Sequence, residues 1–134
     1  MASVPEDLIV MLDPLVSETA GTNLLKGPPP ELPTDLVVLS HYGGEPAEDR
    51  VMGVSRTPPG VEISMVQLYV RNALEATAKS KADTYHALLD NFDGTISGRR
   101  YFQIESVDSA PHSLGQDNRG LWMAVANYRC QHSR

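Results

Sequence analysis

The sequence predicts one α+β domain over residues 1–134, in which a mixed or antiparallel β-sheet is packed by one long central helix and a shorter N-terminal helix. The length of 134 residues suits a single domain with one core. Apolar residues recur at helical spacing near the N-terminus and again over residues 73–92. The strand-like runs do not alternate regularly with these helices, which favours an antiparallel or mixed sheet over a parallel one.

The first element is a short helix. Ser3 is a suitable N-cap, Pro5 suits the first helical turn, and the acidic residues that follow are favoured there by the helix dipole. Pro14 lies inside the helical pattern, and we expect it to kink or end the helix near Asp13 because proline has no amide hydrogen to donate.

A rigid segment and several strands follow. Pro28, Pro29 and Pro30 predict an extended polyproline conformation, which makes no backbone hydrogen bonds of its own. The run of β-branched and aliphatic residues after it ends at a glycine pair, and an acidic, turn-rich loop is expected at 43–50. Strands are predicted at 35–41, at about 51–56, and at 61–70, where the alternation is almost clean.

The second half begins with the helix at 73–92, on whose polar flank His86 is expected to be solvated. Ser97 and Gly98 form the turn of a predicted tight hairpin within residues 95–107. A polar loop is predicted at 109–119, and a last alternating strand at 121–130.

The charge is uneven along the chain. The net charge is −6, and residues 1–50 alone carry −7. An acidic surface argues against tight wrapping of nucleic acid, because lysine and arginine contacts to phosphates supply most non-specific affinity. Glu45, Glu48 and Asp49 could hold a hard cation, but their spacing matches no calcium loop, so a solvated acidic loop is the favoured interpretation.

Residue patterns typical of catalysis or cofactor binding are not found in the sequence. No phosphate-binding glycine motif, nucleophile elbow or zinc-ligand spacing occurs, so we expect neither an enzyme nor a bound cofactor or metal. Cys130 lies in the last strand and is expected to be a small buried side chain. We also expect no signal peptide and no membrane span, and hence a protein that stays in the cytosol in which it is made.

Four arginines stand in the last third of the chain: Arg99, Arg100, Arg119 and Arg129. They could form a patch that contacts phosphate. A patch that meets an acidic surface on a neighbouring subunit is the favoured interpretation, because head-to-tail rings need unlike surfaces on one subunit and the N-terminal half is acidic.

Several motifs, taken in this order and spacing, identify a relationship to a known family. They lie at residues 22–30, 35–39, 43–44, 59–63, 69–71, 96–101 and 113–120. The set resembles the tailed-phage minor capsid protein family, whose members look like tail terminator, or tail-completion, proteins of long-tailed phages. The resemblance spans nearly the whole chain and carries no catalytic residues.

The resemblance implies a structural virion protein that forms a hexameric ring at the neck. Such a ring would cap the tail tube, end its polymerisation and join it to the head-side connector, while genomic DNA passes through the lumen without specific binding. Assembly would take place in the host cytoplasm.

On this reading, two groups of residues are candidates for function. The candidate contacts between subunits or rings are Pro28, Pro29, Pro30, Arg99, Arg100, Asp117 and Arg119. An acidic lumen or loop is predicted at Glu45, Glu48 and Asp49. The proline run could equally be a spacer between two elements. Alternative functions are a head-completion or connector adaptor, a tail-tube subunit, or a small enzyme or ligand-binding domain unrelated to phages.

Overall fold

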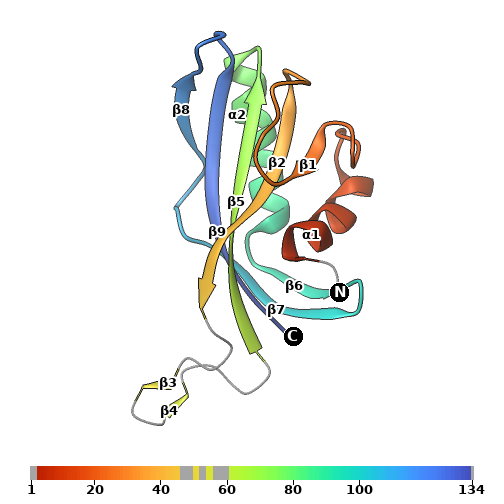
Figure 1. The fold of residues 1–134 in the computed structure, drawn as a ribbon, viewed down its shortest axis with the longest axis vertical. Coiled ribbons are helices and arrows are strands. Elements are labelled where there is room, and N and C mark those ends of the chain that lie inside the picture. The colour runs from red at the N-terminus through yellow and green to blue at the C-terminus, as the bar shows by residue number, and fades with distance from the viewer. Residues whose placement is uncertain (1–2, 46–49, 52–53, 56–60, 134) are drawn as a thin grey trace.

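A computed structural model describes residues 3–45, 50–51, 54–55 and 61–133 (Figure 1). Within these residues there are two α-helices and one short 3-10 helix: α1 (Val4–Leu12), η1 (Asp13–Leu15) and α2 (Glu75–Leu89). The strands are β1 (Leu24–Lys26), β2 (Leu36–Glu45), β3 (Arg50–Val51), β4 (Val54–Ser55), β5 (Val61–Asn72), β6 (Phe92–Ile96), β7 (Arg99–Ser106), β8 (His112–Gln116) and β9 (Trp122–Ser133).

One large sheet organises the described residues. Its strand order is β1-β2-β5-β9-β7-β6, and β8 also pairs with β9. The β1–β2 pair is parallel and the other pairs of this sheet are antiparallel, so the sheet is mixed. Strands β3 and β4 form a separate two-stranded hairpin. The predicted α+β class with a mixed sheet is confirmed.

Strands β8 and β7 both pair with β9, on the side opposite β5. The first residues of β9 pair with β8 and its later residues pair with β7. Between them the chain leaves the ladder, and Asp108 Oδ2 accepts hydrogen bonds from the Asn127 backbone nitrogen at 3.1 Å and its side-chain Nδ2 at 3.3 Å. The Val107 amide donates to the Asn127 carbonyl at 2.9 Å. The gap between β8 and β7 along β9 is therefore closed by hydrogen bonds, as the backbone of an interior strand requires.

The core lies between the sheet and the two helices, both of which contact the same face (Figure 1). Because side chains alternate along a strand, one face of each central strand supplies the core. From the three central strands these core residues are Val37, Leu39, Val66, Leu68, Val70, Ala124, Ala126, Tyr128 and Cys130. The helices add Leu8 and Leu12 from α1, and Ala78, Ala82, Tyr85 and Leu89 from α2.

The N-terminal helix forms as the sequence predicts. Ser3 has an extended backbone and its Oγ accepts a hydrogen bond from the Glu6 amide at 3.3 Å, as an N-cap does. The helix ends at Leu12 and tightens into η1, where Pro14 stands. Proline therefore ends the helix where its missing amide hydrogen would first break the bonding pattern.

The prediction of one long central helix is wrong. Helix α2 has 15 residues and ends at Leu89, whereas the sequence pattern continued to residue 92. Asn91 has a φ of 65°, a left-handed conformation that stops a helix and that asparagine tolerates better than most residues. Phe92, expected on the helix, instead begins β6 and packs against the core from there.

Two further sequence expectations need correction. The predicted polar loop at 109–119 contains strand β8, whose side chains are mostly exposed and which is held by its backbone pairing to β9. His86 is half-buried, and its Nδ1 lies 2.7 Å from the hydroxyl of Tyr128. The side chain of this core tyrosine reaches the flank of α2 and gives His86 a partner there.

A buried carboxylate joins the segment after η1 to α2. Glu18 accepts hydrogen bonds from the Tyr85 hydroxyl at 2.6 Å and from Lys81 Nζ. Its side chain is 3% exposed. Burial by itself raises the pKa of Glu18, but the hydrogen bonds from Lys81 and Tyr85 and the charge of Lys81 outweigh it, so the pKa lies below its usual 4.5.

Replacing Glu18 with glutamine is expected to change how stability depends on pH. Because the pKa of Glu18 is lowered by folding, its carboxylate stabilises the fold above pH 4.5 and loses this contribution as the pH falls through the lowered value. The difference in unfolding free energy between wild type and Glu18→Gln should be largest near neutrality and shrink in acid. Urea titrations between pH 7 and pH 3 measure it.

The exposed pair of Glu6 and Lys26, whose Oε1 and Nζ lie 2.6 Å apart, provides the control. Glu6→Gln should leave the pH profile close to that of wild type, because exposed ion pairs are weak. A constant difference between Glu18→Gln and wild type over the whole pH range would contradict the role given to the Glu18 carboxylate.

A second buried ion pair joins α1 to the β6–β7 hairpin. The Asp7 carboxylate accepts hydrogen bonds from Arg99 Nη1 at 3.0 Å and from the Tyr101 hydroxyl at 2.7 Å. The side chains of Asp7 and Arg99 are 2% and 9% exposed. Burial and the hydrogen bond to Asp7 raise the pKa of Tyr101, which stays a donor at all ordinary pH values. This cluster fixes the N-terminal helix over the edge of the sheet.

Candidate functional site

The proline segment predicted as a contact element is held by a single buried arginine. Arg71 lies at the end of β5, and the residue is 4% exposed. Its Nε donates to the carbonyl of Thr34 at 3.0 Å, and its Nη2 lies 2.7 Å from the carbonyls of Pro30 and Pro33. A further bond of 3.2 Å reaches the carbonyl of Glu31. Four consecutive or near-consecutive carbonyls thus converge on one guanidinium.

The composition of the segment explains this arrangement. Prolines have no amide hydrogen, so residues 28–33 cannot join a regular ladder, and their carbonyls need donors from elsewhere. An arginine side chain carries five N–H donors in a rigid planar fork, which suits several acceptors at once. With the carbonyls of 30, 31, 33 and 34 turned toward Arg71, Pro28, Pro29 and Pro30 remain exposed.

The turn between β8 and β9 joins the same site. Asp117 Oδ1 accepts hydrogen bonds from the amides of Leu121 at 3.0 Å and Arg119 at 2.8 Å, and these bonds, with burial opposing, lower its pKa. Arg119 then donates to the Glu31 carbonyl at 2.8 Å. The structure therefore brings together Pro30, Asp117 and Arg119, which the sequence proposed as contacts without a reason to place them side by side.

The other two candidate contacts lie elsewhere. Arg99 is engaged in the internal ion pair with Asp7, and Arg100 bonds to Asp93 at 2.5 Å and stacks over the Phe102 ring at 5.4 Å. Arg119 lies in the turn before β9 and Arg129 in the second half of that strand, about 20 Å or more along it at roughly 3.3 Å per strand residue. The four late arginines therefore do not form one patch.

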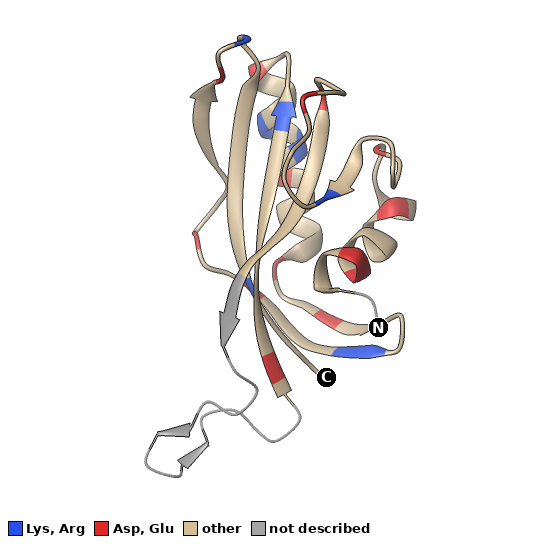
Figure 2. Ribbon diagram, viewed as in Figure 1, with Lys and Arg blue, Asp and Glu red and all other residues tan. Residues whose placement is uncertain are grey.

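The predicted acidic loop falls largely on residues that the structure does not describe. Glu48 and Asp49 lie outside the described residues, and Glu45 is described as the last residue of β2 by its backbone alone. Figure 2 shows the charges that are described. On the central strands β5 and β9, the side chains of Gln67 and Asn127 bond at 3.3 Å.

Most described basic side chains are already engaged within the chain. Ion pairs link Lys26 to Glu6, Lys81 to Glu18, Arg99 to Asp7, Arg100 to Asp93 and Arg119 to Asp117. The guanidinium of Arg71 is taken up by carbonyls. Phosphate binding relies on such cations, so this engagement reduces what the described surface offers to nucleic acid.

One pair has the spacing of a catalytic dyad. Ser64 Oγ lies 2.7 Å from His132 Nε2, and His132 Nδ1 lies 2.7 Å from the Ser133 carbonyl. Both side chains are buried, and burial lowers the pKa of His132. A nucleophile needs access to its substrate, whereas this pair bridges the neighbouring strands β5 and β9 within the sheet.

Other potential reactive groups are few. Burial raises the pKa of Cys130 to about 12, so its thiol is not nucleophilic at neutral pH. Among the described residues, no group of three histidine, cysteine or acidic side chains is placed to hold a metal ion. In the same part of the chain, no helix is long and apolar enough to cross a membrane.

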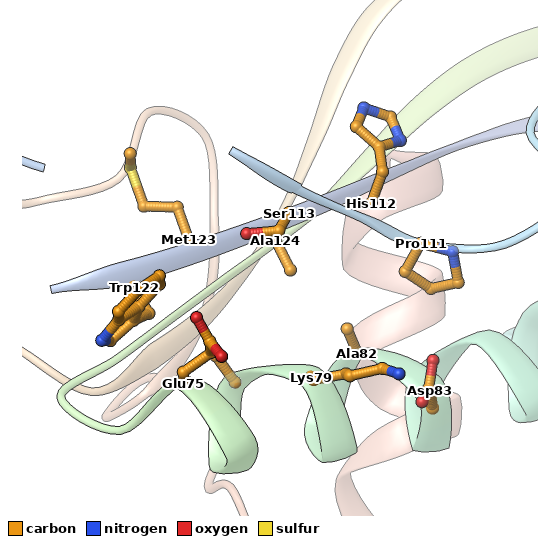
Figure 3. A pocket seen from close by; sticks show the side chains of 11 residues that line it. Glu75, Lys79, Ala82, Asp83, Pro111, His112, Ser113, Trp122, Met123 and Ala124 are labelled. Carbon is orange, nitrogen blue, oxygen red and sulfur yellow. The ribbon is translucent and has the colours of Figure 1, made fainter. Parts of the chain in front are cut away.

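A groove of about 270 Å³ runs between α2 and the edge formed by β8 and β9 (Figure 3). It is lined by alanines from both sides, Ala78, Ala82 and Ala124, and by Trp122 and Pro111. The charged residues at its rim lie along α2, while His112 points away from the helix (Figure 3). Small apolar residues beside a tryptophan provide space for an apolar side chain and hold no paired acid and base for catalysis.

Sequence reasoning missed the residues that hold these features in place: Asp7, Glu18, Arg71, Ser64 and His132. For Arg71 a signal existed, because a charged residue ends an apolar strand in a chain that also has a proline segment without donors. For Asp7 and Glu18 the partners stand far away in the sequence, and no local pattern marks them.

The fold is one that a virion subunit also has. A chain of a structure described as the virion of a native gene transfer agent particle matches it with a TM-score of 0.58 and 16% sequence identity, over 99% of this chain and 87% of that chain. A comparison with curated proteins finds no match.

The family model for bacteriophage tail terminator proteins matches residues 26–134, and the chain belongs to this family. The resemblance inferred from the motifs is thereby confirmed. The protein is a structural, tail-related component of the virion.

Proposed function

We propose that this protein is the tail terminator of a long-tailed phage. It forms a hexameric ring at the neck that caps the tail tube, ends tube polymerisation and joins the tube to the head-side connector. DNA passes through the lumen of the ring, and assembly takes place in the host cytoplasm. The observation that carries this proposal is the match of the tail terminator family model over residues 26–134.

The geometry supports the same role. A ring subunit needs unlike surfaces for its neighbours on each side. The described residues offer a stiff proline segment at one end and an apolar groove along the β8 edge. The chain carries a net charge of −6 and six of its described basic residues are engaged internally, which suits a lumen through which DNA slides.

Tail length in lysates that lack the protein tests the proposal. Amber mutation of its gene should give tails of unequal and excessive length that are not joined to heads, because nothing ends tube growth. Electron microscopy of negatively stained lysates measures tail length and attachment. Supplying the protein from a plasmid should restore uniform tails, which controls for effects on neighbouring genes.

The alternatives give different images. Loss of a connector adaptor would leave tails of normal length beside unjoined heads. A tail-tube subunit would leave no tails at all, and the purified protein would polymerise without a template. Either result would overturn the assignment as terminator while keeping the protein in the virion.

A further inference from the structure

We propose that residues 28–35 with Leu74 and Glu75, here named the proline end, form a preformed contact surface for another protein ring of the tail. The surface that fits it is apolar at its centre and carries lysine or arginine at its rim. This inference rests on the proposed function, since it names the surface through which the ring would dock onto its neighbour.

The backbone of the proline end is fixed before any partner arrives. Arg71 binds four carbonyls of residues 30–34 at 2.7–3.2 Å, and Arg119 binds the Glu31 carbonyl a second time at 2.8 Å. With these polar groups directed inward, Leu32 is left 71% exposed. Docking such a segment costs little conformational entropy, because both the prolines and the carbonyl bonds already restrict it.

A second exposed leucine stands beside this segment. Asp35 Oδ1 accepts a hydrogen bond from the Ala73 amide at 2.9 Å, which ties the end of the proline segment to the start of α2. Leu74, the next residue, is 64% exposed. Figure 1 shows the 31–35 turn, the start of α2 and the β8–β9 turn at the same end of the molecule. The proline rings, Leu32 and Leu74 thus give one end an apolar centre.

The rim of this end is acidic. Glu31, Asp35 and Glu75 are all exposed, and in the described part of the chain no lysine or arginine forms an ion pair with them. The nearby Arg119 bonds to the Glu31 carbonyl and pairs with Asp117 instead. Complementarity therefore favours a basic protein rim, and it disfavours both DNA and the same end of a second copy, which would bring acids against acids.

The test measures binding of the purified full chain to two probes: tubes assembled from the tail-tube protein encoded with this chain, and the head-side connector ring. The double variant Leu32→Ser/Leu74→Ser should weaken binding to the tubes about tenfold or more, the loss expected for central apolar contacts, whereas a loss confined to the connector ring would overturn the assignment to a ring of the tail. Glu31→Lys/Glu75→Lys should weaken the same interaction. Cosedimentation of labelled protein gives the dissociation constants.

Two substitutions of the same kinds, at exposed positions away from the proline end, are the controls. Val107→Ser removes an apolar side chain that is 55% exposed away from the proline end, and Glu105→Lys reverses an exposed acid on β7. Both should bind as wild type does. Because all altered residues are exposed, circular dichroism and ring size by light scattering should not change.

The outcomes separate the two proposals. Wild-type protein that binds a probe, with proline-end variants binding within about twofold of it, would overturn the contact surface and leave the terminator role in place. Wild-type protein that binds neither probe and does not limit tube length would overturn the terminator role itself. Loss of binding in the controls as well would show a general defect and also reject the proline end as the specific surface.

Discussion

Replacing Arg71 with methionine is expected to lower the free energy of unfolding by about 3 kcal/mol or more and to expose residues 28–34 to proteolysis. Methionine keeps most of the side-chain volume but donates no hydrogen bond. The carbonyls of Pro30, Pro33 and Thr34 would lose their donor, while that of Glu31 keeps Arg119, and unsatisfied polar groups cost about 1–3 kcal/mol each when water cannot reach them.

The size of the loss in unfolding free energy depends on whether water reaches the segment once Arg71 no longer holds it. If the segment lifts away from Arg71, water satisfies the released carbonyls and the loss becomes smaller. Urea unfolding and limited proteolysis followed by mass spectrometry measure the two effects. Cleavage within 28–34 at unchanged global stability would still show that Arg71 holds the segment.

Two further variants test how the loss of stability depends on the hydrogen-bond donors that are removed. Arg71→Lys keeps the charge but offers three donors from one point, so it should fall between wild type and Arg71→Met. Arg119→Met removes one bond to the same segment from a more exposed side chain, and it should cost about 1 kcal/mol or less. Equal losses for Arg119→Met and Arg71→Met would contradict the central place of Arg71.

Replacing Asp7 with alanine is expected to destabilise the protein by about 3–5 kcal/mol. The change leaves Arg99 buried without its carboxylate and removes the acceptor of the Tyr101 hydroxyl. A buried charge that loses its partner is more costly than the absence of both charges. Thermal and urea unfolding of the purified variant measure the loss.

A double variant distinguishes this explanation from a loss of packing alone. Asp7→Leu/Arg99→Met removes both charges and fills their space with apolar groups, so it should recover most of the stability lost in Asp7→Ala. Tyr101→Phe, which removes one hydrogen bond and keeps the ring, should cost about 1 kcal/mol. A double variant as unstable as Asp7→Ala would reject the ion-pair explanation.

The parts of the fold that depend on local pattern were predictable. The alternation over 61–70 predicts β5, and Ser3 with Pro5 predicts the start of α1, because in both cases neighbouring residues determine the structure. The end of α2 was not predictable from periodicity, because the apolar stripe continues through Phe92 while Asn91 turns the chain. The strand β8 was missed because its exposed polar residues show no alternation and its backbone pairing defines it.

The candidate site was predictable in part. The prolines mark a stiff segment, and Asp117 and Arg119 mark a turn, yet only the three-dimensional arrangement joins them through Arg71 and Glu31. Asp7 looked like an ordinary acid in a first helical turn, but it is buried against an arginine 92 positions later in the chain. Contacts over such separations depend on topology, and one sequence does not specify it.

The position of β9 has a consequence for synthesis of the chain on the ribosome. This strand follows every other strand in sequence, yet it pairs with β5 along its whole length and with both β7 and β8 on its other side. Until β9 emerges, β5 has an open edge, and the core lacks Ala124, Ala126 and Tyr128. Incomplete nascent chains therefore cannot close the sheet, and the fold is completed only after translation has passed the final strand.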